Sequence, residues 1–107
     1  MIDLCFYVNG QFLQRDPTSP FRKLVAGSFN LYNVIFHFSS DWAGFRAIAV
    51  LKAGSISYEV PIVDGMILLP AKLLEYHKIT IQVIGKKDDA VIKTTESSII
   101  QTGGLTA

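Results

Sequence analysis

The side chains that could do chemistry in this sequence are one cysteine, two histidines and nine carboxylates. A nucleophile needs a base within hydrogen-bond reach, and a structural zinc site needs about four Cys or His ligands. Cys5 lies in the apolar run of residues 2–8, which predicts a small buried hydrophobe, and His37 and His77 have no paired spacing. Most of the carboxylates fall among turn residues. We therefore predict no catalytic residue, no metal site and no cofactor, and a protein that is not an enzyme.

The aromatic residue with the most informative position is Trp42. It follows three polar residues, 39–41, and precedes Gly44, where the chain must change direction. We predict that its ring fills one end of the core, and the alternative is a stacking platform for a sugar or a base. The residues predicted to form the core with it are Val34, Phe36 and Phe38.

Length and composition limit the classes of protein that the chain can be. With 107 residues it fits one domain, 1–107, and half of its residues are hydrophobic. The net charge is only +1, and the basic residues are spread from Arg15 to Lys93, which disfavours nucleic-acid binding. No signal peptide and no apolar run of membrane-spanning length is visible, so we predict no membrane partner and production in a cytoplasm.

The dominant hydrophobic period is two, which indicates strands. Residues 1–15 read as an amino-terminal hairpin with a type I′ turn at Asn9-Gly10, and Asp64-Gly65 reads as another hairpin turn. Pro70 opens a single short helical turn over 71–76, and 103–107 reads as a flexible end. The spacing predicts an all-β, antiparallel β-sandwich of roughly eight strands, Ig-like or jelly-roll-like. Its expected strands are 2–8, 11–14, 31–38, 46–52, 56–63, 66–69, 78–84, 90–93 and 97–101.

The segment Phe36-His37-Phe38-Ser39-Ser40-Asp41-Trp42-Ala43-Gly44, followed by the apolar strand 47–51, has a recognisable pattern. It resembles a β-domain in virion proteins of phages that infect Gram-positive bacteria, such as the amino-terminal region of baseplate upper proteins and of related tail or head fibre proteins. Further pieces that match the pattern are residues 9–10, 25–28, 58–62, 68–70, 79–85, 94–95 and 99–103. The resemblance implies a virion module that docks one protein on another.

We therefore expect a phage structural protein that attaches to other virion proteins of a baseplate, tail or head fibre, assembled in the host cytoplasm and found in the virion. Docking is expected through an apolar face or an exposed strand edge, and self-association into a homo-oligomer stays open. One alternative is a carbohydrate-binding module for a host cell-wall glycan, and another is a small phage inhibitor of a host protein. The tyrosines that could contact a ligand or partner are Tyr7, Tyr58 and Tyr76.

Overall fold

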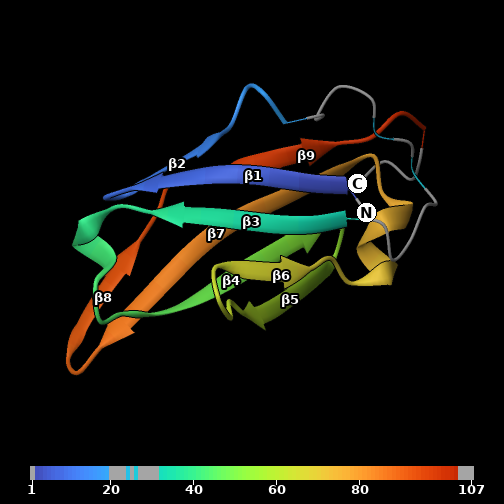
Figure 1. Cartoon of the computed structure of the whole chain (residues 1–107). Coiled ribbons are helices and arrows are strands. Elements are labelled where there is room, and N and C mark those ends of the chain that lie inside the picture. Colours follow the sequence, from blue (N-terminus) through green and yellow to red (C-terminus); the bar gives the residue numbers. More distant parts are fainter. Residues whose placement is uncertain (1, 20–23, 25, 27–31, 104–107) are drawn as a thin grey trace.

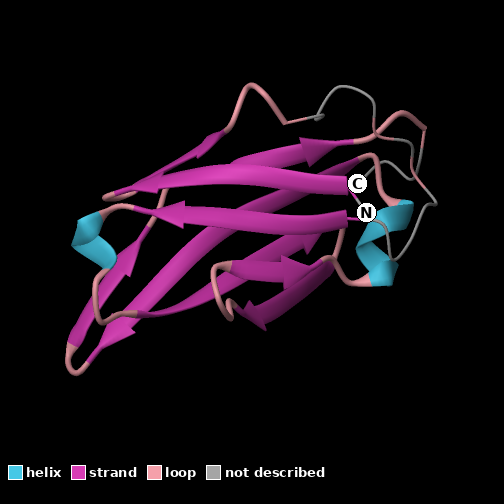
Figure 2. Ribbon diagram, viewed as in Figure 1, coloured by secondary structure: helices cyan, strands magenta, loops and turns pink. Residues whose placement is uncertain are grey.

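The chain folds into two β-sheets packed face to face, as the sequence predicts. The computed structural model describes residues 2–19, 24, 26 and 32–103. In Figures 1 and 2 one sheet lies in front of the other, and short helical turns sit at the two ends. The first sheet has the order β2 (Phe12–Arg15), β1 (Ile2–Asn9), β3 (Tyr32–Phe38), β6 (Met66–Leu68). The second sheet has the order β5 (Ile56–Pro61), β4 (Arg46–Ala53), β7 (Lys78–Lys87). On its other side β7 pairs with two short strands, β8 (Ala90–Lys93) and β9 (Ser97–Ile100).

Among the described residues, two 3₁₀ turns connect the sheets, and one of them was predicted. η3 (Ala71–Glu75) follows Pro70, as the sequence indicates, whereas η2 (Ser40–Trp42) lies where we expected only a break between strands. Of the predicted flexible end, residues 104–107 lie outside the described residues, as do residue 31 of the third expected strand and residues 25, 27 and 28 of the resemblance.

The pairing of the four-stranded sheet departs from the expected antiparallel pattern at one place. β1 and β3 run parallel over seven residue pairs, from Ile2↔Tyr32 to Val8↔Phe38. The end of β2 and the start of β3 lie at the same end of the sandwich, so the chain enters β3 in the direction of β1 (Figure 1). Parallel and antiparallel neighbours show the same alternation of apolar side chains, so the sequence carries no signal for this pair.

The core consists of the inward-facing residues of both sheets. Leu4, Phe6 and Val8 on β1 are at most 1% exposed, and so are Ile79, Ile81 and Val83 on β7. Alternation with period two therefore identifies the buried face of both strands correctly. Of the residues predicted for the core, Val34, Phe36 and Trp42 are 0%, 3% and 5% exposed, whereas Phe38 is partly buried and packs against the core.

The first hairpin turns one residue later than the sequence suggests. Asn9 pairs with Phe12, so the two loop residues are Gly10 and Gln11 instead of Asn9 and Gly10. Gly10 has a φ of +56° and Gln11 has no positive φ, which is the pattern of a type II′ turn with glycine first, and the predicted type I′ turn is wrong. At the other predicted hairpin turn, Asp64 and Gly65 both have positive φ, 54° and 74°, as a type I′ turn requires.

β7 is longer than predicted because Gly85 is part of the strand and not of the turn after it. Gly85 pairs with Ala47 on one side and with Ile92 on the other, and β7 continues to Lys87. A Cβ at Gly85 would overlap the ring of Trp42 and would come within 2.9 Å of Cγ2 of Ile92. Glycine in a strand interior often marks such a close approach.

Threonine and glutamine side chains close the sandwich where strand pairing stops. The hydroxyl Oγ1 of Thr95 accepts a hydrogen bond from the backbone N–H of Leu13 (3.2 Å), and the N–H of Thr95 donates to the carbonyl of Gln11 (2.7 Å). These bonds tie β2 to the connection between β8 and β9. At the opposite end, Nε2 of the buried Gln101 donates to the carbonyls of Leu74 (3.3 Å) and Tyr76 (2.8 Å).

The contact between Trp42 and Gly85 predicts that Gly85→Ala destabilises the fold. The added methyl group overlaps the indole ring, and overpacking of this kind costs about 1–3 kcal/mol in the free energy of unfolding. Urea denaturation of both proteins measures the difference. In the double variant with Trp42→Leu, which removes the ring, the cost of Gly85→Ala should fall, with a coupling of at least about 0.5 kcal/mol. An unchanged urea midpoint for Gly85→Ala would show that the ring does not lie there.

Candidate functional site

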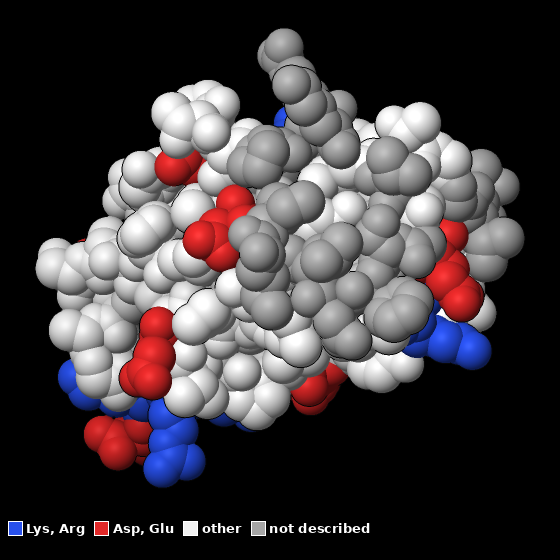
Figure 3. All heavy atoms as spheres, turned by 45° about the vertical axis from the view of Figure 1, so that its right-hand side comes forward, with Lys and Arg blue, Asp and Glu red and all other residues white. Residues whose placement is uncertain are grey.

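Charged side chains are sparse in this protein, at 18% of the sequence. Figure 3 shows acidic and basic side chains scattered over the visible face, with both signs close together at its lower left. Among the described residues, no group of three or more His, Cys, Asp or Glu side chains is placed to hold a metal ion. The candidate site must therefore be sought among the apolar and aromatic residues.

Trp42 ties together three elements at one end of the sandwich. Its indole Nε1–H donates a 2.8 Å hydrogen bond to the carbonyl of Gly10 in the β1–β2 turn, and its ring packs on Gly85 of β7. The backbone of η2 presents the ring, with the N–H of Trp42 donating to the carbonyl of Ser39 (3.1 Å). The buried indole therefore satisfies its one polar group and holds the hairpin, η2 and β7 in fixed positions.

Ser39 supports the same end of the molecule. Its hydroxyl accepts a 3.1 Å hydrogen bond from the N–H of Gly10 and donates at 3.3 Å to Oδ2 of Asp41. Its backbone N–H donates to the carbonyl of Val8 (2.8 Å). Both backbone groups of Gly10 are thus bound by the segment that carries Trp42, so the polar residues before the tryptophan have a positioning role.

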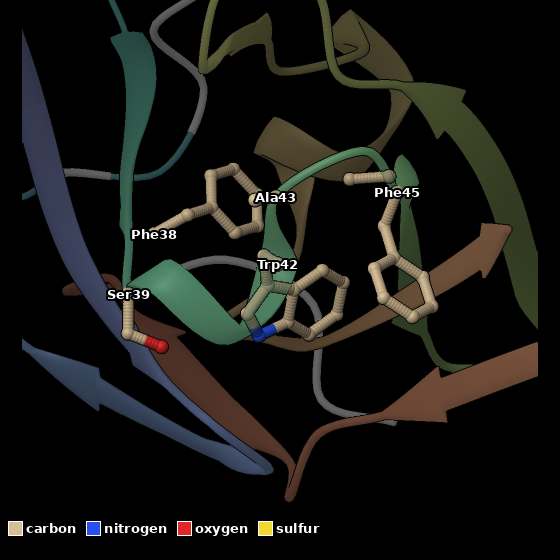
Figure 4. Close-up of a pocket in the computed structure, with 6 residues that line it drawn as sticks. Phe38, Ser39, Trp42, Ala43 and Phe45 are labelled. Carbon is tan, nitrogen blue, oxygen red and sulfur yellow. The ribbon is translucent and has the colours of Figure 1, made fainter.

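Aromatic rings form a continuous series from the core to the surface. The ring centroids of Phe6 and Phe36 are 5.8 Å apart, those of Phe36 and Phe38 6.2 Å, those of Phe38 and Trp42 5.2 Å, and those of Trp42 and Phe45 6.1 Å. These distances lie in the range of favourable aromatic pairs. Figure 4 shows Phe38, Trp42 and Phe45 arranged around a hollow, with Ser39 at its edge.

Two adjoining hollows at this edge make one surface feature, which we call the aromatic groove. The first has a volume of about 260 Å³ and is lined by Phe38, Ser39, Trp42, Ala43, Phe45 and Ala47. The second, of about 570 Å³, shares Phe38, Phe45 and Ala47 with the first and adds Arg46, Ile48, Pro61, Ile62 and Gly65. The lining holds no carboxylate, histidine or cysteine, so the groove is suited to apolar contact and not to acid–base chemistry.

The groove exists because the four-stranded sheet has no edge strand beside the end of β3. β3 pairs with β6 only as far as Ile35↔Met66, and the N–H of Phe36 donates to the carbonyl of Gly65 (2.7 Å). The chain makes its tight turn at Asp64-Gly65 just before β6 begins, and β6 then runs from Ile35 toward Asn33, away from Phe38. The last residues of β3 therefore border a hollow instead of a neighbouring strand.

The three tyrosines predicted as contact residues lie on different parts of the molecule. Tyr7 is 47% exposed on the outer face of β1, and Tyr58 is 36% exposed on the edge strand β5 of the other sheet. Tyr76 is partly buried after η3, with its ring against Gly54. The three tyrosines do not form one surface, and none of them lines the aromatic groove.

The remaining titratable candidates also lie away from the groove. The buried position predicted for Cys5 is wrong: it is half-buried on the outer face of β1, because Leu4, Phe6 and Val8 are the residues of that strand that face the core. His37 is exposed on the same outer face, with its ring 5.4 Å from that of Tyr7.

Two further titratable residues lie outside the groove. His77 is exposed after η3. Asp16 lies near Tyr7, and hydrogen bonds from the backbone N–H and the hydroxyl of Thr18 lower the pKa of its carboxyl group.

Sequence reasoning found Phe38 and Trp42 and missed the rest of the groove. Phe45, Pro61 and Ile62 come together only through the packing of β4 and the β5–β6 connection, which periodicity does not reveal. The glycine in the middle of an otherwise alternating strand, Gly85, is the one local signal that could have indicated a large side chain packed against β7.

Comparison with known proteins gives no relative. No family model matches the chain, and neither a curated protein nor a solved structure matches it significantly. Within the part of the chain that the structure describes, no helix has the length and apolar character of a membrane span.

The bond from Trp42 to Gly10 predicts that Trp42→Phe destabilises the protein although it keeps an aromatic ring. The Gly10 carbonyl loses its donor, and an unsatisfied part-buried acceptor costs about 1–3 kcal/mol. Urea denaturation measures the loss. The matched control is Tyr7→Phe, which removes an exposed hydroxyl with a weak 3.5 Å bond and should change stability by less than about 0.5 kcal/mol. Equal effects of the two variants would contradict this role of the indole.

Proposed function

We propose that this protein is a structural module of a phage particle that docks on other virion proteins through the aromatic groove. The observation that carries the proposal is a hollow with apolar walls, rigidly supported by a buried tryptophan, at an edge where the sheets lack a neighbouring strand. Sites of this kind gain binding free energy by excluding water from apolar surface. The proposal assigns the chain to the virion, with assembly in the host cytoplasm, and gives it no catalytic step.

Exposed apolar side chains beside the groove support a docking role. Val63, next to the groove residue Ile62, is 64% exposed, and Met66 and Leu68 on β6 are 41% and 48% exposed. Val63 lies just before the tight turn that borders the groove, and Met66 and Leu68 lie in β6, the strand after that turn. Neighbouring exposed apolar residues mark protein-interaction surfaces more often than scattered ones do.

The assignment to a phage particle is based on the sequence resemblance. The segment that carries the resemblance, residues 36–44, is also the segment that supplies Phe38, Ser39 and Trp42 to the groove. In a particle, the number of copies would follow the symmetry of the axis on which the module sits.

A carbohydrate-binding role has less support. Trp42 is 5% exposed and its Nε1–H is already bonded, so its ring offers no open stacking surface. Of the two polar side chains that line the groove, Ser39 and Arg46, the hydroxyl of Ser39 is already bonded to Gly10 and Asp41. A sugar site needs several free polar groups beside its aromatic ring.

The docking proposal predicts that Val63→Asp abolishes incorporation of the protein into phage particles while leaving its fold intact. Val63 is 64% exposed, so an aspartate there costs little stability but places a charge beside the groove. Particles assembled with each variant are purified, and the copy number of the chain is measured by quantitative mass spectrometry.

The matched control is Ile100→Asp, which places the same charge at a 44% exposed apolar residue of β9, opposite Lys78 at the far end of the sandwich. We expect its incorporation to equal that of the unmodified protein. Absence of the unmodified chain from particles would overturn the virion assignment, and equal incorporation of Val63→Asp and Ile100→Asp would overturn the docking surface.

A further inference from the structure

We infer that the aromatic groove takes an extended partner segment, added as a β-strand along Phe38, with a bulky apolar side chain in the hollow and a carboxylate toward Arg46 and Lys87. The inference rests on the proposed docking function and names the partner's chemistry. It follows from the unpaired backbone at the end of β3, from the size of the hollow and from the charges around it.

The backbone of Phe38 has an open side that faces the groove. The N–H of Phe36 donates toward Gly65, and the N–H of Ser39 donates in the opposite direction, toward Val8 of β1. Because successive residues of a strand direct their backbone groups to opposite sides, the N–H and carbonyl of Phe38 point away from β1. β6 does not reach this position, since its pairing with β3 ends at Ile35. An added strand would satisfy these groups, as in other complexes formed at a sheet edge.

The first hollow of the groove, the one beside Trp42, has room for one bulky side chain. Its volume is about 260 Å³, slightly below the range of about 300–1,000 Å³ typical of drug-sized ligand and cofactor sites. Phe38, Trp42 and Phe45 surround it with rings (Figure 4). In a strand added beside Phe38, alternate side chains point to the same face, so one of them can enter the hollow.

The charges around the groove favour an acidic partner. Arg46 lines the groove, and Nζ of Lys87 lies 6.0 Å from the ring centroid of Phe45. Arg46 is also directly opposite Lys86 in the pairing of β4 with β7, and like charges in this position repel. Among the described residues, none of these three cations forms an ion pair with a carboxylate.

The acidic residues of the chain near this end do not neutralise the three cations. Asp41 accepts a hydrogen bond from Ser39, and Asp64 lies in the tight turn beside Gly65. Asp88 and Asp89 form the β7–β8 turn and make no ion pair with the adjacent lysines. A carboxylate from the partner can therefore approach Arg46 and Lys87 and reduce their repulsion.

A titration followed by NMR tests the inference. The ¹⁵N-labelled full chain is titrated with the end-blocked peptide Thr-Val-Phe-Val-Glu-Thr, and with two variants in which Phe is replaced by Ala or Glu by Lys. We expect amide shift changes at Phe38, Phe45 and Arg46. Affinity should fall about tenfold or more without the Phe side chain and about threefold or more with Lys in place of Glu.

Substitutions in the protein provide the matched control. Arg46→Glu should remove most of the preference for the Glu peptide over the Lys peptide, whereas Lys78→Glu, the same kind of charge change at the opposite end of the sandwich, should leave it unchanged. Absence of binding at millimolar peptide, shift changes elsewhere, or equal binding of the Glu and Lys peptides would each overturn strand addition. If Val63→Asp still prevents incorporation into particles in that case, docking stands and only its mode is wrong.

Discussion

The packing of the Trp42 ring on the bare backbone of Gly85 is the contact on which this end of the molecule depends. Only glycine leaves room for the indole on β7, and only at this depth does Nε1 reach the carbonyl of Gly10 at 2.8 Å. The first hairpin, η2 and β7 are far apart in sequence, and this one side chain fixes their relative positions. The walls of the groove are therefore rigid before any partner binds, which lowers the entropic cost of association.

The groove is the consequence of a sandwich whose edges are only partly closed. At one edge Thr95 bonds to β2 and connects the sheets. At the other edge, β6 begins only after the type I′ turn at Asp64-Gly65, so its pairing does not reach the end of β3, which is left without a neighbour. Natural sheets usually protect such edges, since an open edge can pair with another chain. Here the open edge is short and lies between aromatic rings, a combination that suits a specific partner better than indiscriminate aggregation.

Local patterns predicted the strands well and their arrangement less well. The alternation in residues 2–8 and 78–84 identified buried faces correctly, because each strand has one face toward the core. The parallel pairing of β1 with β3 was missed, because it depends on which end of the sandwich the chain returns to. The predicted strand ended before Gly85, since the sequence does not show the distant Trp42 that requires a glycine there. The groove was missed for the same reason, since Phe45 and Ile62 meet only in the folded protein.

The most direct test of this account is a nuclear Overhauser measurement between the Trp42 indole protons and the α protons of Gly85 in the isotopically labelled protein. The account predicts strong cross-peaks between them, together with slow solvent exchange of the indole N–H because it is bonded to Gly10. If the cross-peaks are absent and the indole N–H exchanges as fast as in a short peptide, Trp42 does not close this end of the sandwich. The rigid aromatic groove, and the docking function proposed for it, would then be contradicted.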